Sequence, residues 1–315
     1  MLRLFFTDMP GESFSGNIPE LSNQEILIKH CISQHINIIA GEIGERNIWN
    51  YDSLNATANY IVNDFKTTNK NVNFQNFLVK GKIVKNVEIE FLGNSLPEEI
   101  ILIGAHYDSV LGTPGANDNG SGIAALLELA KLCTKDEFNR TIRFVAFVNE
   151  EPPFFQTASM GSWVYARRSR QRNEKIVAMF SLETIGSYSD KIGSQKYPFP
   201  FGMLYPNKGN FLAFVSDLSS RNLVKKCIAS FRKNATLPSE GIAAAHWIPG
   251  ISWSDQWAFW QEKFPAIMIT DTAPFRYLYY HTAEDTPEKL DYDNLTRAVM
   301  GLFHVIMDLD HLPEN

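Results

Sequence analysis

The sequence predicts an α/β fold, a three-layer α/β/α sandwich around a mixed, mostly parallel twisted sheet. Three short apolar runs, rich in β-branched and aromatic residues, lie at residues 100–105, 142–148 and 176–182. Such runs are typical of strands that are covered on both faces. Segments of helical length separate them, beginning with the apolar stretch 123–130. This alternation favours parallel strands with helices on both sides of the sheet.

The chain is predicted to form a single domain over residues 1–315. Of its 315 residues 44% are hydrophobic and 20% are charged, so it can bury a large core. Residues 1–70 are expected to be mainly helical and to pack on the rest of the domain. Within them, Ser22 and Glu25 form a capping-box pattern that opens a helix to about residue 40.

The other elements are predicted from apolar periodicity and from cap and turn signals. They are a helix at 52–65, strands at 72–77 and 87–92, a helical stretch from 158, mixed strand and loop at 191–206, a helix at 209–231, a helix that starts at Ser254 and Asp255, a strand at 264–270 and a helix at 292–309.

Each of the three apolar runs ends in side chains that can bind a metal ion. The first run delivers His106, the second delivers Glu150 and Glu151, and the third delivers Glu183. In open α/β sheets, ligands bind beyond the carboxyl ends of the strands. An acidic pair alone is usually a solvated surface feature. Three runs that place imidazole or carboxylate groups at one edge of a sheet instead predict a two-metal hydrolase.

A glycine-rich turn between the first two runs carries a further carboxylate. Asp118 lies within residues 115–122, just before the apolar stretch 123–130. The glycines allow the backbone to pass close to metal ions, and a carboxylate has two oxygens with which to bridge two cations. The alternative is an ordinary junction between loop and helix, in which Asp118 or Asn119 caps the helix.

Five segments of the sequence resemble the M28 zinc peptidases, a family that includes bacterial aminopeptidases. The segments occur in the family's order over roughly residues 80 to 310, with weaker similarity upstream at 44–47. They are residues 104–109, 115–122, 149–151, 182–186 and 280–286. The resemblance implies the same three-layer sandwich.

The resemblance also implies two zinc ions per chain. Asp118 would bridge them, with Glu151 and His281 completing one site and His106 and Glu183 completing the other. Each ion would have three protein ligands, which leaves a position open for water or substrate, as in catalytic zinc sites. Many members of the family have Asp where this chain has Glu183, and the longer side chain could shift one ion.

Two further acidic residues receive roles from the same resemblance. Glu150 would be the general base, which takes a proton from the attacking water and passes it to the leaving amine. Asp108 would accept the second N–H of the His106 imidazole and so fix the tautomer of that ring.

The substrate pocket is expected among aromatic residues close to the metal ligands. Proline and aromatic residues follow the acidic pair, and aromatic residues crowd the region between 246 and 281. An aromatic pocket would favour a hydrophobic side chain on the residue that is cleaved, although several of these residues could equally belong to the core. The candidate pocket residues are Phe154, Phe155, Trp253, Asp255 and Tyr280.

Charge and composition limit the partners and the compartment. The net charge of −6 and the absence of a long basic stripe argue against a nucleic-acid partner. No run approaches the roughly 20 apolar residues of a membrane helix. The three cysteines cannot all pair and favour a reducing compartment. The apolar stretch within residues 1–10 is too short for the core of a signal peptide. The chain as written is therefore expected in the cytoplasm, or secreted or periplasmic if a signal has been removed.

Three functions are considered. The first is a two-zinc aminopeptidase, whose substrate is a peptide with a free N-terminus. The second is a glutaminyl-peptide cyclotransferase, a relative on the same scaffold that uses one zinc ion to close an N-terminal glutamine. The third is a non-catalytic binding domain, which would have no use for Glu150. Residues 119–122, which follow Asp118, look peptidase-like and favour hydrolysis. The sequence leaves the oligomeric state open.

Overall fold

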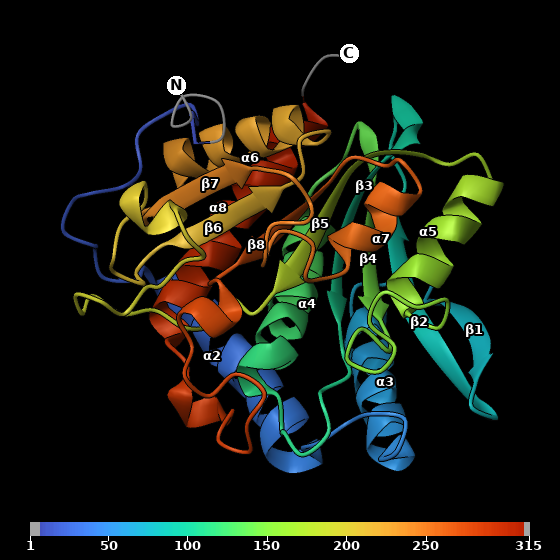
Figure 1. Cartoon of the computed structure of the whole chain (residues 1–315). Coiled ribbons are helices and arrows are strands. Elements are labelled where there is room, and N and C mark those ends of the chain that lie inside the picture. The colour runs from blue at the N-terminus through green and yellow to red at the C-terminus, as the bar shows by residue number, and fades with distance from the viewer. Residues whose placement is uncertain (1–6, 312–315) are drawn as a thin grey trace.

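The computed structural model describes residues 7–311, so the first part of the segment considered for a signal peptide lies outside the described residues. An eight-stranded sheet runs through the centre of the molecule (Figure 1). Its strands are β1 (Asn73–Val79), β2 (Lys82–Phe91), β3 (Leu96–His106), β4 (Arg140–Phe147), β5 (Lys175–Glu183), β6 (Leu212–Ser216), β7 (Ser239–Ala243) and β8 (Ala266–Thr270).

The sheet is mixed, with the strand order β1-β2-β4-β3-β5-β8-β6-β7. The four central strands, β4, β3, β5 and β8, are parallel. The hairpin of β1 and β2 pairs antiparallel with β4 at one edge, and the parallel pair of β6 and β7 runs antiparallel to β8 at the other. The predicted mixed, mostly parallel sheet is therefore confirmed. Because the central strands are parallel, their carboxyl ends lie at one edge of the sheet, where ligands are expected to bind.

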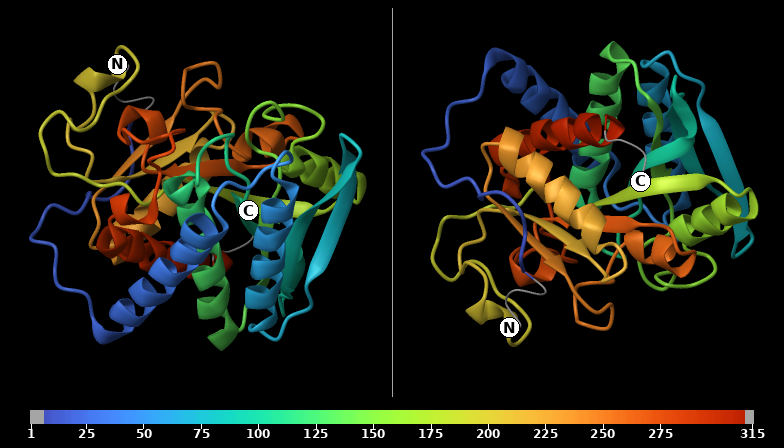
Figure 2. Two further views of the ribbon diagram at one scale, coloured as in Figure 1. Left: turned by 90° about the horizontal axis from the view of Figure 1, so that it is seen from below. Right: turned by 90° about the horizontal axis from the view of Figure 1, so that it is seen from above.

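The α-helices within residues 7–311 are α2 (Asn23–Ile36), α3 (Tyr51–Lys66), α4 (Gly122–Leu132), α5 (Gly161–Gln171), α6 (Arg221–Asn234), α7 (Gln256–Gln261) and α8 (Tyr292–Asp310). Side chains of α3, α4, α6 and α8 join one apolar cluster with the sheet, and α2 packs against α4 and α8. Side chains of α5 and α7 form a second cluster with β3, β4 and β5. The helices thus cover both faces (Figure 1; Figure 2), which confirms the predicted three-layer sandwich.

The N-terminal helices begin as the sequence predicts. The Ser22 main-chain N–H donates to the Glu25 carboxylate at 2.8 Å, and the Glu25 N–H donates to the Ser22 hydroxyl at 3.3 Å, which completes the capping box. A π-helix, Asn37–Ile43, continues directly from α2. Ile32 and Ile36 of α2 and Phe65 of α3 are fully buried in the main core. The helices of residues 1–70 are therefore part of the packed structure.

The prediction for residues 209–231 is wrong. This stretch contains β6, a connection and α6 instead of one helix. All five residues of β6 are buried; Phe214 joins the core beneath α6 and Val215 joins a cluster on the opposite face. A short run that is buried on both faces has no clear period, so the sequence does not distinguish it from a buried helix. Residues 191–206 form a loop with one short 3-10 helix, Phe201–Met203. The strand that was expected in this stretch is not formed.

None of the helices in residues 7–311 is both long and apolar enough to cross a membrane.

Candidate metal centre

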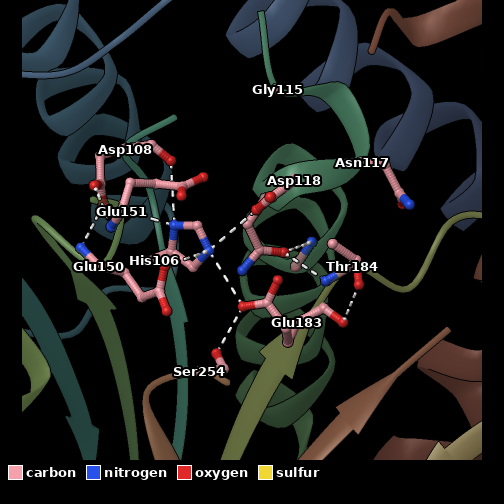
Figure 3. A network of polar contacts seen from close by, with 12 residues as sticks. His106, Asp108, Gly115, Asn117, Asp118, Glu150, Glu151, Glu183, Thr184 and Ser254 are labelled. Carbon is pink, nitrogen blue, oxygen red and sulfur yellow. Dashed lines mark hydrogen bonds and ion pairs between the residues drawn. The ribbon is translucent and has the colours of Figure 1, made fainter. Parts of the chain in front are cut away.

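Five candidate metal ligands come together at the carboxyl edge of the central strands. His106 is the last residue of β3 and Glu183 is the last residue of β5, while Glu151 follows β4. Asp118 lies in the turn before α4, and His281 lies in the connection between β8 and α8. Figure 3 shows His106, Asp118 and Glu183 pointing toward one another. Residues that are far apart in the sequence thus form one cluster.

The Asp118 carboxylate lies between the two histidines. Its Oδ1 is 3.3 Å from His106 Nε2, and its Oδ2 is 3.0 Å from His281 Nε2. His106 Nε2 is also 3.2 Å from Glu183 Oε2, and His281 Nε2 is 3.4 Å from Glu151 Oε2. The cluster therefore consists of two groups of three side chains that share Asp118, with one carboxylate oxygen facing each group.

Buried polar atoms without partners test whether this cluster fits metal ions. His106 Nε2, Asp118 Oδ1 and Glu151 Oε1 are buried and have no hydrogen-bond partner in the described part of the chain, residues 7–311. One ligand atom from each of these three residues can be chosen so that all lie within 4.8 Å of one another. Leaving such atoms unsatisfied costs free energy, which a bound cation would remove. Imidazole nitrogen and carboxylate oxygen are donors that Zn²⁺ accepts, so the residues fit this metal.

The main chain of Asp108 fixes the tautomer of His106. His106 Nδ1 lies 3.2 Å from the Asp108 carbonyl oxygen, which can only accept a hydrogen bond. In the neutral ring, which is the form that binds a metal ion, Nδ1 therefore carries the proton, and Nε2 keeps a free lone pair that faces Asp118 and Glu183. The Asp108 carboxylate, which the sequence analysis expected to play this part, is 3.6 Å from Nδ1, too far for a hydrogen bond.

The Asp108 carboxylate instead holds the turn that carries the acidic pair. Its two oxygens accept the main-chain N–H groups of Glu150 and Glu151, each at 3.1 Å. The Oε2 atom of Glu150 then lies 3.8 Å from His106 Nε2, and in Figure 3 the acidic pair lies on the side of His106 away from Glu183. Asp108 thus positions the candidate base and one candidate ligand together.

The turn that holds Asp118 depends on a glycine and on a buried aspartate. Gly115 has φ +62°, and a Cβ atom there would lie 2.3 Å from the Asp118 carbonyl oxygen, so no other residue fits. The Asp285 carboxylate accepts the N–H groups of Asn117 and Asp118 at 2.8 and 3.0 Å. Asp285 was not singled out by the sequence analysis, although residues 280–286 were among the segments that carry the resemblance.

Arg46 is a second residue whose role the sequence did not reveal. Its side chain is completely buried and donates to the main-chain carbonyls of Tyr107, Pro114 and Gly115. It therefore ties the end of β3 to the turn that carries Asp118. The signal in the sequence was the weaker similarity at residues 44–47, which indicated no role for any one residue.

Replacing Arg46 by Met is expected to destabilise the protein by about 2–4 kcal/mol, because three buried carbonyls would lose a charged donor while the volume is nearly kept. Urea unfolding of the metal-free protein measures this loss. Arg172→Met is the matched control, since the Arg172 side chain is 59% exposed. An Arg46 variant as stable as the control would show that the hydrogen bonds of Arg46 do not stabilise the folded protein.

The candidate pocket residues occupy different surroundings. Trp253 stacks on Phe275, and Tyr280 stacks on the His281 imidazole with ring centroids 3.8 Å apart. Phe154 is buried against Trp49 instead. With Glu183, Trp253 and Tyr280 line a cavity of about 110 Å³ next to the metal centre. The remaining candidates, Phe155 and Asp255, are not part of its lining.

Asp255 is a fully buried acid at the start of α7. Its side chain does not cap that helix, and neither carboxylate oxygen has a hydrogen-bond partner within residues 7–311. Burial raises the pKa of Asp255 to about 7. Its neighbour Ser254 donates a hydrogen bond of 2.6 Å to Glu183 Oε2, which orients that candidate ligand.

The proton affinities of the cluster reflect its burial and its crowded charges. Burial raises the pKa of Glu150 well above its usual value. Burial, with the nearby charge of Asp118, raises the pKa of Glu151 to about 8. Burial alone would lower the pKa of His281, but hydrogen bonds to Asp118 and Glu151 outweigh it and raise this pKa to about 10. Without a cation, the folded cluster therefore holds protons that the unfolded chain would release near neutral pH.

The metal-free protein is expected to lose stability as the pH rises from 5 to 9. Glu151, Asp255 and His281 have raised pKa values, so in this range the folded state binds more protons than the unfolded state, and a higher pH favours unfolding. The pKa of Asp118 is lowered, so this residue changes the free energy of unfolding only at a pH below this range. Urea midpoints between pH 5 and 9 measure the effect. A metal-free protein whose midpoint rises over this range would contradict it.

Comparison with known proteins places this chain in one family. The sequence profile described as Peptidase family M28 matches residues 86–306, more than half of the chain. The protein YfbL of Escherichia coli strain K12, described as uncharacterized, is 36% identical over 284 residues, which cover 87% of this chain and 86% of YfbL. Aminopeptidase YwaD of Bacillus subtilis strain 168 is 36% identical over 94 residues, which cover 30% of this chain and 20% of YwaD.

Solved structures share the fold at low sequence identity. BSAP, a zinc aminopeptidase from Bacillus subtilis, matches with a TM-score of 0.73 at 14% identity and covers 90% of this chain and 95% of that one. A glutaminyl cyclase from Bacteroides thetaiotaomicron matches with a TM-score of 0.67 at 17% identity and covers 92% and 99%. At these identities the likeness establishes the fold alone.

The three-layer sandwich, with its buried histidine and carboxylate cluster at the carboxyl edge of the sheet, fits a metal-dependent enzyme. The match over residues 86–306, together with the similarity to YfbL, shows that the chain belongs to peptidase family M28. It is therefore a metallopeptidase, as the motifs of the sequence predicted.

Proposed function

We propose that this chain is an aminopeptidase that holds two zinc ions and releases the N-terminal residue of a peptide. The observation that carries the proposal is the position of Asp118, whose two carboxylate oxygens face two separate groups of candidate ligands. One group contains His106 and Glu183, and the other contains Glu151 and His281. The similarity to YwaD, an aminopeptidase, and to BSAP, a zinc aminopeptidase, supports the choice of activity and of metal.

The chain's own residues have separate parts in this reaction. Bound zinc would polarise the scissile carbonyl and lower the pKa of the attacking water. Glu150 takes the proton of that water and delivers it to the amine that leaves. Asp108 holds the main chain of Glu150 in place, and Ser254 orients Glu183. The carboxylates around the centre also favour the ammonium group of a free N-terminus over a neutral, blocked one.

A glutaminyl cyclase is the alternative, since one solved structure with this fold has that name. A cyclase with one zinc ion would need only one of the two groups of ligands. In this chain both groups are complete, and Asp118 faces both, so hydrolysis with two ions is favoured. The peptidase-like residues 119–122 favour the same reaction.

The proposal is tested with free and N-acetylated aminoacyl anilides, including the glutaminyl compound, with and without a chelator. We expect cleavage of the free anilides, no cleavage of the acetylated ones, and loss of activity with the chelator. If the zinc-loaded protein cleaves none of them but converts N-terminal glutamine to pyroglutamate, the aminopeptidase proposal is wrong and the cyclase replaces it.

A further inference from the structure

A cavity beside the metal centre is lined by one acidic residue besides the candidate ligand Glu183, among mostly apolar walls. The cavity of about 110 Å³ has room for several water-sized groups, each of which needs about 10–15 Å³. Glu183 lies at one side of it and Glu240 of β7 lies at another. Between them, the walls are mostly aromatic and aliphatic side chains, which include Tyr197, Tyr205, Phe211, Trp253, Met268 and Phe275.

The strand register places Glu240 in line with Glu183. Glu183 pairs with Thr270 of β8, Thr270 pairs with Ala213 of β6, and Ala213 pairs with Glu240 of β7. Residues that pair directly across a sheet point to the same face. The two glutamates therefore share a face and lie three strands apart, about 14 Å between main chains at the usual strand spacing. The cavity lies over this face of the sheet, because all four of the paired residues line it.

The Glu240 carboxylate has no side-chain partner of its own. Within residues 7–311 it forms no hydrogen bond and no ion pair. Tyr197 and Tyr205 line the cavity too, but their hydroxyls donate to the carbonyls of Pro206 and Gly241. Arg232 acts on Glu240 only at a distance, since its hydrogen bonds go to residues 9–11 and to Ser239. A half-buried carboxylate thus remains available to a ligand.

We propose that this cavity receives the side chain of the N-terminal residue of the substrate, and that Glu240 selects lysine or arginine there. The proposal rests on the aminopeptidase function proposed above and names its substrate class. A side chain must be long to reach across from the metal centre to Glu240, and it must end in a cation to pair with the carboxylate.

The walls of the cavity suit such a side chain along its whole length. The methylene groups of lysine and arginine pack on apolar surfaces while the charged end reaches a polar partner. The rings of Tyr197 and Tyr205, next to Glu240, attract a cation over their faces. An uncharged side chain of the same length would fill the same space but would leave the carboxylate desolvated and unpaired, which is costly. Lys196 lines the cavity too, but it is an exposed residue.

The test compares lysyl and arginyl anilides with the norleucyl anilide, whose side chain resembles that of lysine without the charge. For the wild-type protein with zinc, we expect kcat/KM for the basic substrates to exceed that for norleucine by about 10- to 100-fold, the usual effect of one hydrogen bond to a charged group. Glu240→Gln should remove most of this ratio, because it takes away the partner of the basic substrates and also the unpaired carboxylate that penalises the norleucyl anilide.

A matched control is Glu98→Gln, an exposed glutamate on β3 of the same sheet, and it should leave the ratio unchanged. The proposal is overturned if the wild type does not prefer the basic substrates, or if Glu240→Gln slows all anilides equally. Calorimetric binding of lysinamide and norleucinamide to the Glu150→Gln variant separates the two proposals. If no anilide is cleaved, the aminopeptidase function fails, whereas preferential binding of lysinamide would still support the role of Glu240, and equal binding would overturn it.

Discussion

Replacing Glu150 by Gln is expected to lower kcat by about 10²- to 10⁴-fold while the protein keeps its zinc. Glu150 is 7% exposed and its Oε2 lies 3.8 Å from His106 Nε2. Its carboxylate is therefore close to the candidate ligands but belongs to neither of the two groups around Asp118. Glutamine keeps the size of the side chain and one acceptor oxygen, but it does not take up a proton. Hydrolysis of a leucyl anilide and zinc content by atomic absorption are the two measurements.

The two measurements together identify the role of Glu150. Lost turnover with full zinc content supports the general base. If zinc is lost along with activity, Glu150 is a ligand and the division of roles within the acidic pair is wrong. Normal activity would exclude Glu150 from the chemistry altogether. Glu98→Gln, at an exposed position of the same sheet, is the control, and it should change neither turnover nor zinc content.

The ends of the apolar runs could be predicted because strand and ligand are neighbours in the sequence. His106 and Glu183 follow directly from the runs that form β3 and β5, and parallel strands place their carboxyl ends together. His281 has no such run before it. Its place in the cluster was expected only from the resemblance, and the structure brings its Nε2 within 3.0 Å of Asp118.

Contacts between distant segments could not be predicted in the same way. Arg46 binds carbonyls of residues 107, 114 and 115, and no periodic pattern links these positions. Glu240 faces the cavity only because β7 pairs with β6 in one register, and β7 was not expected at all. The resemblance to the M28 family assigned the Asp108 carboxylate to His106, whereas in the structure this carboxylate accepts hydrogen bonds from the turn after β4.

Replacing Asp118 by Ala is expected to remove zinc from both sites, since Asp118 is the residue whose two carboxylate oxygens face both groups of candidate ligands. Loss of an outer partner of a metal ligand usually lowers affinity by roughly 10- to 100-fold, and loss of a bridging ligand should exceed this for each ion. Zinc content after dialysis against a weak chelator measures the effect, with activity as a second readout.

Single-site variants show whether Asp118 bridges two ions. Glu183→Ala and Glu151→Ala each remove a ligand from one group only, so each variant should retain about one zinc ion per chain where the wild type holds two. Asp118→Ala should then hold fewer ions than either. If all three variants lose the same single ion from a wild type that binds only one, the chain has one zinc site. The two groups around Asp118 would then not act as separate metal sites, and the cyclase alternative, which uses one zinc ion, would gain support over the two-metal mechanism.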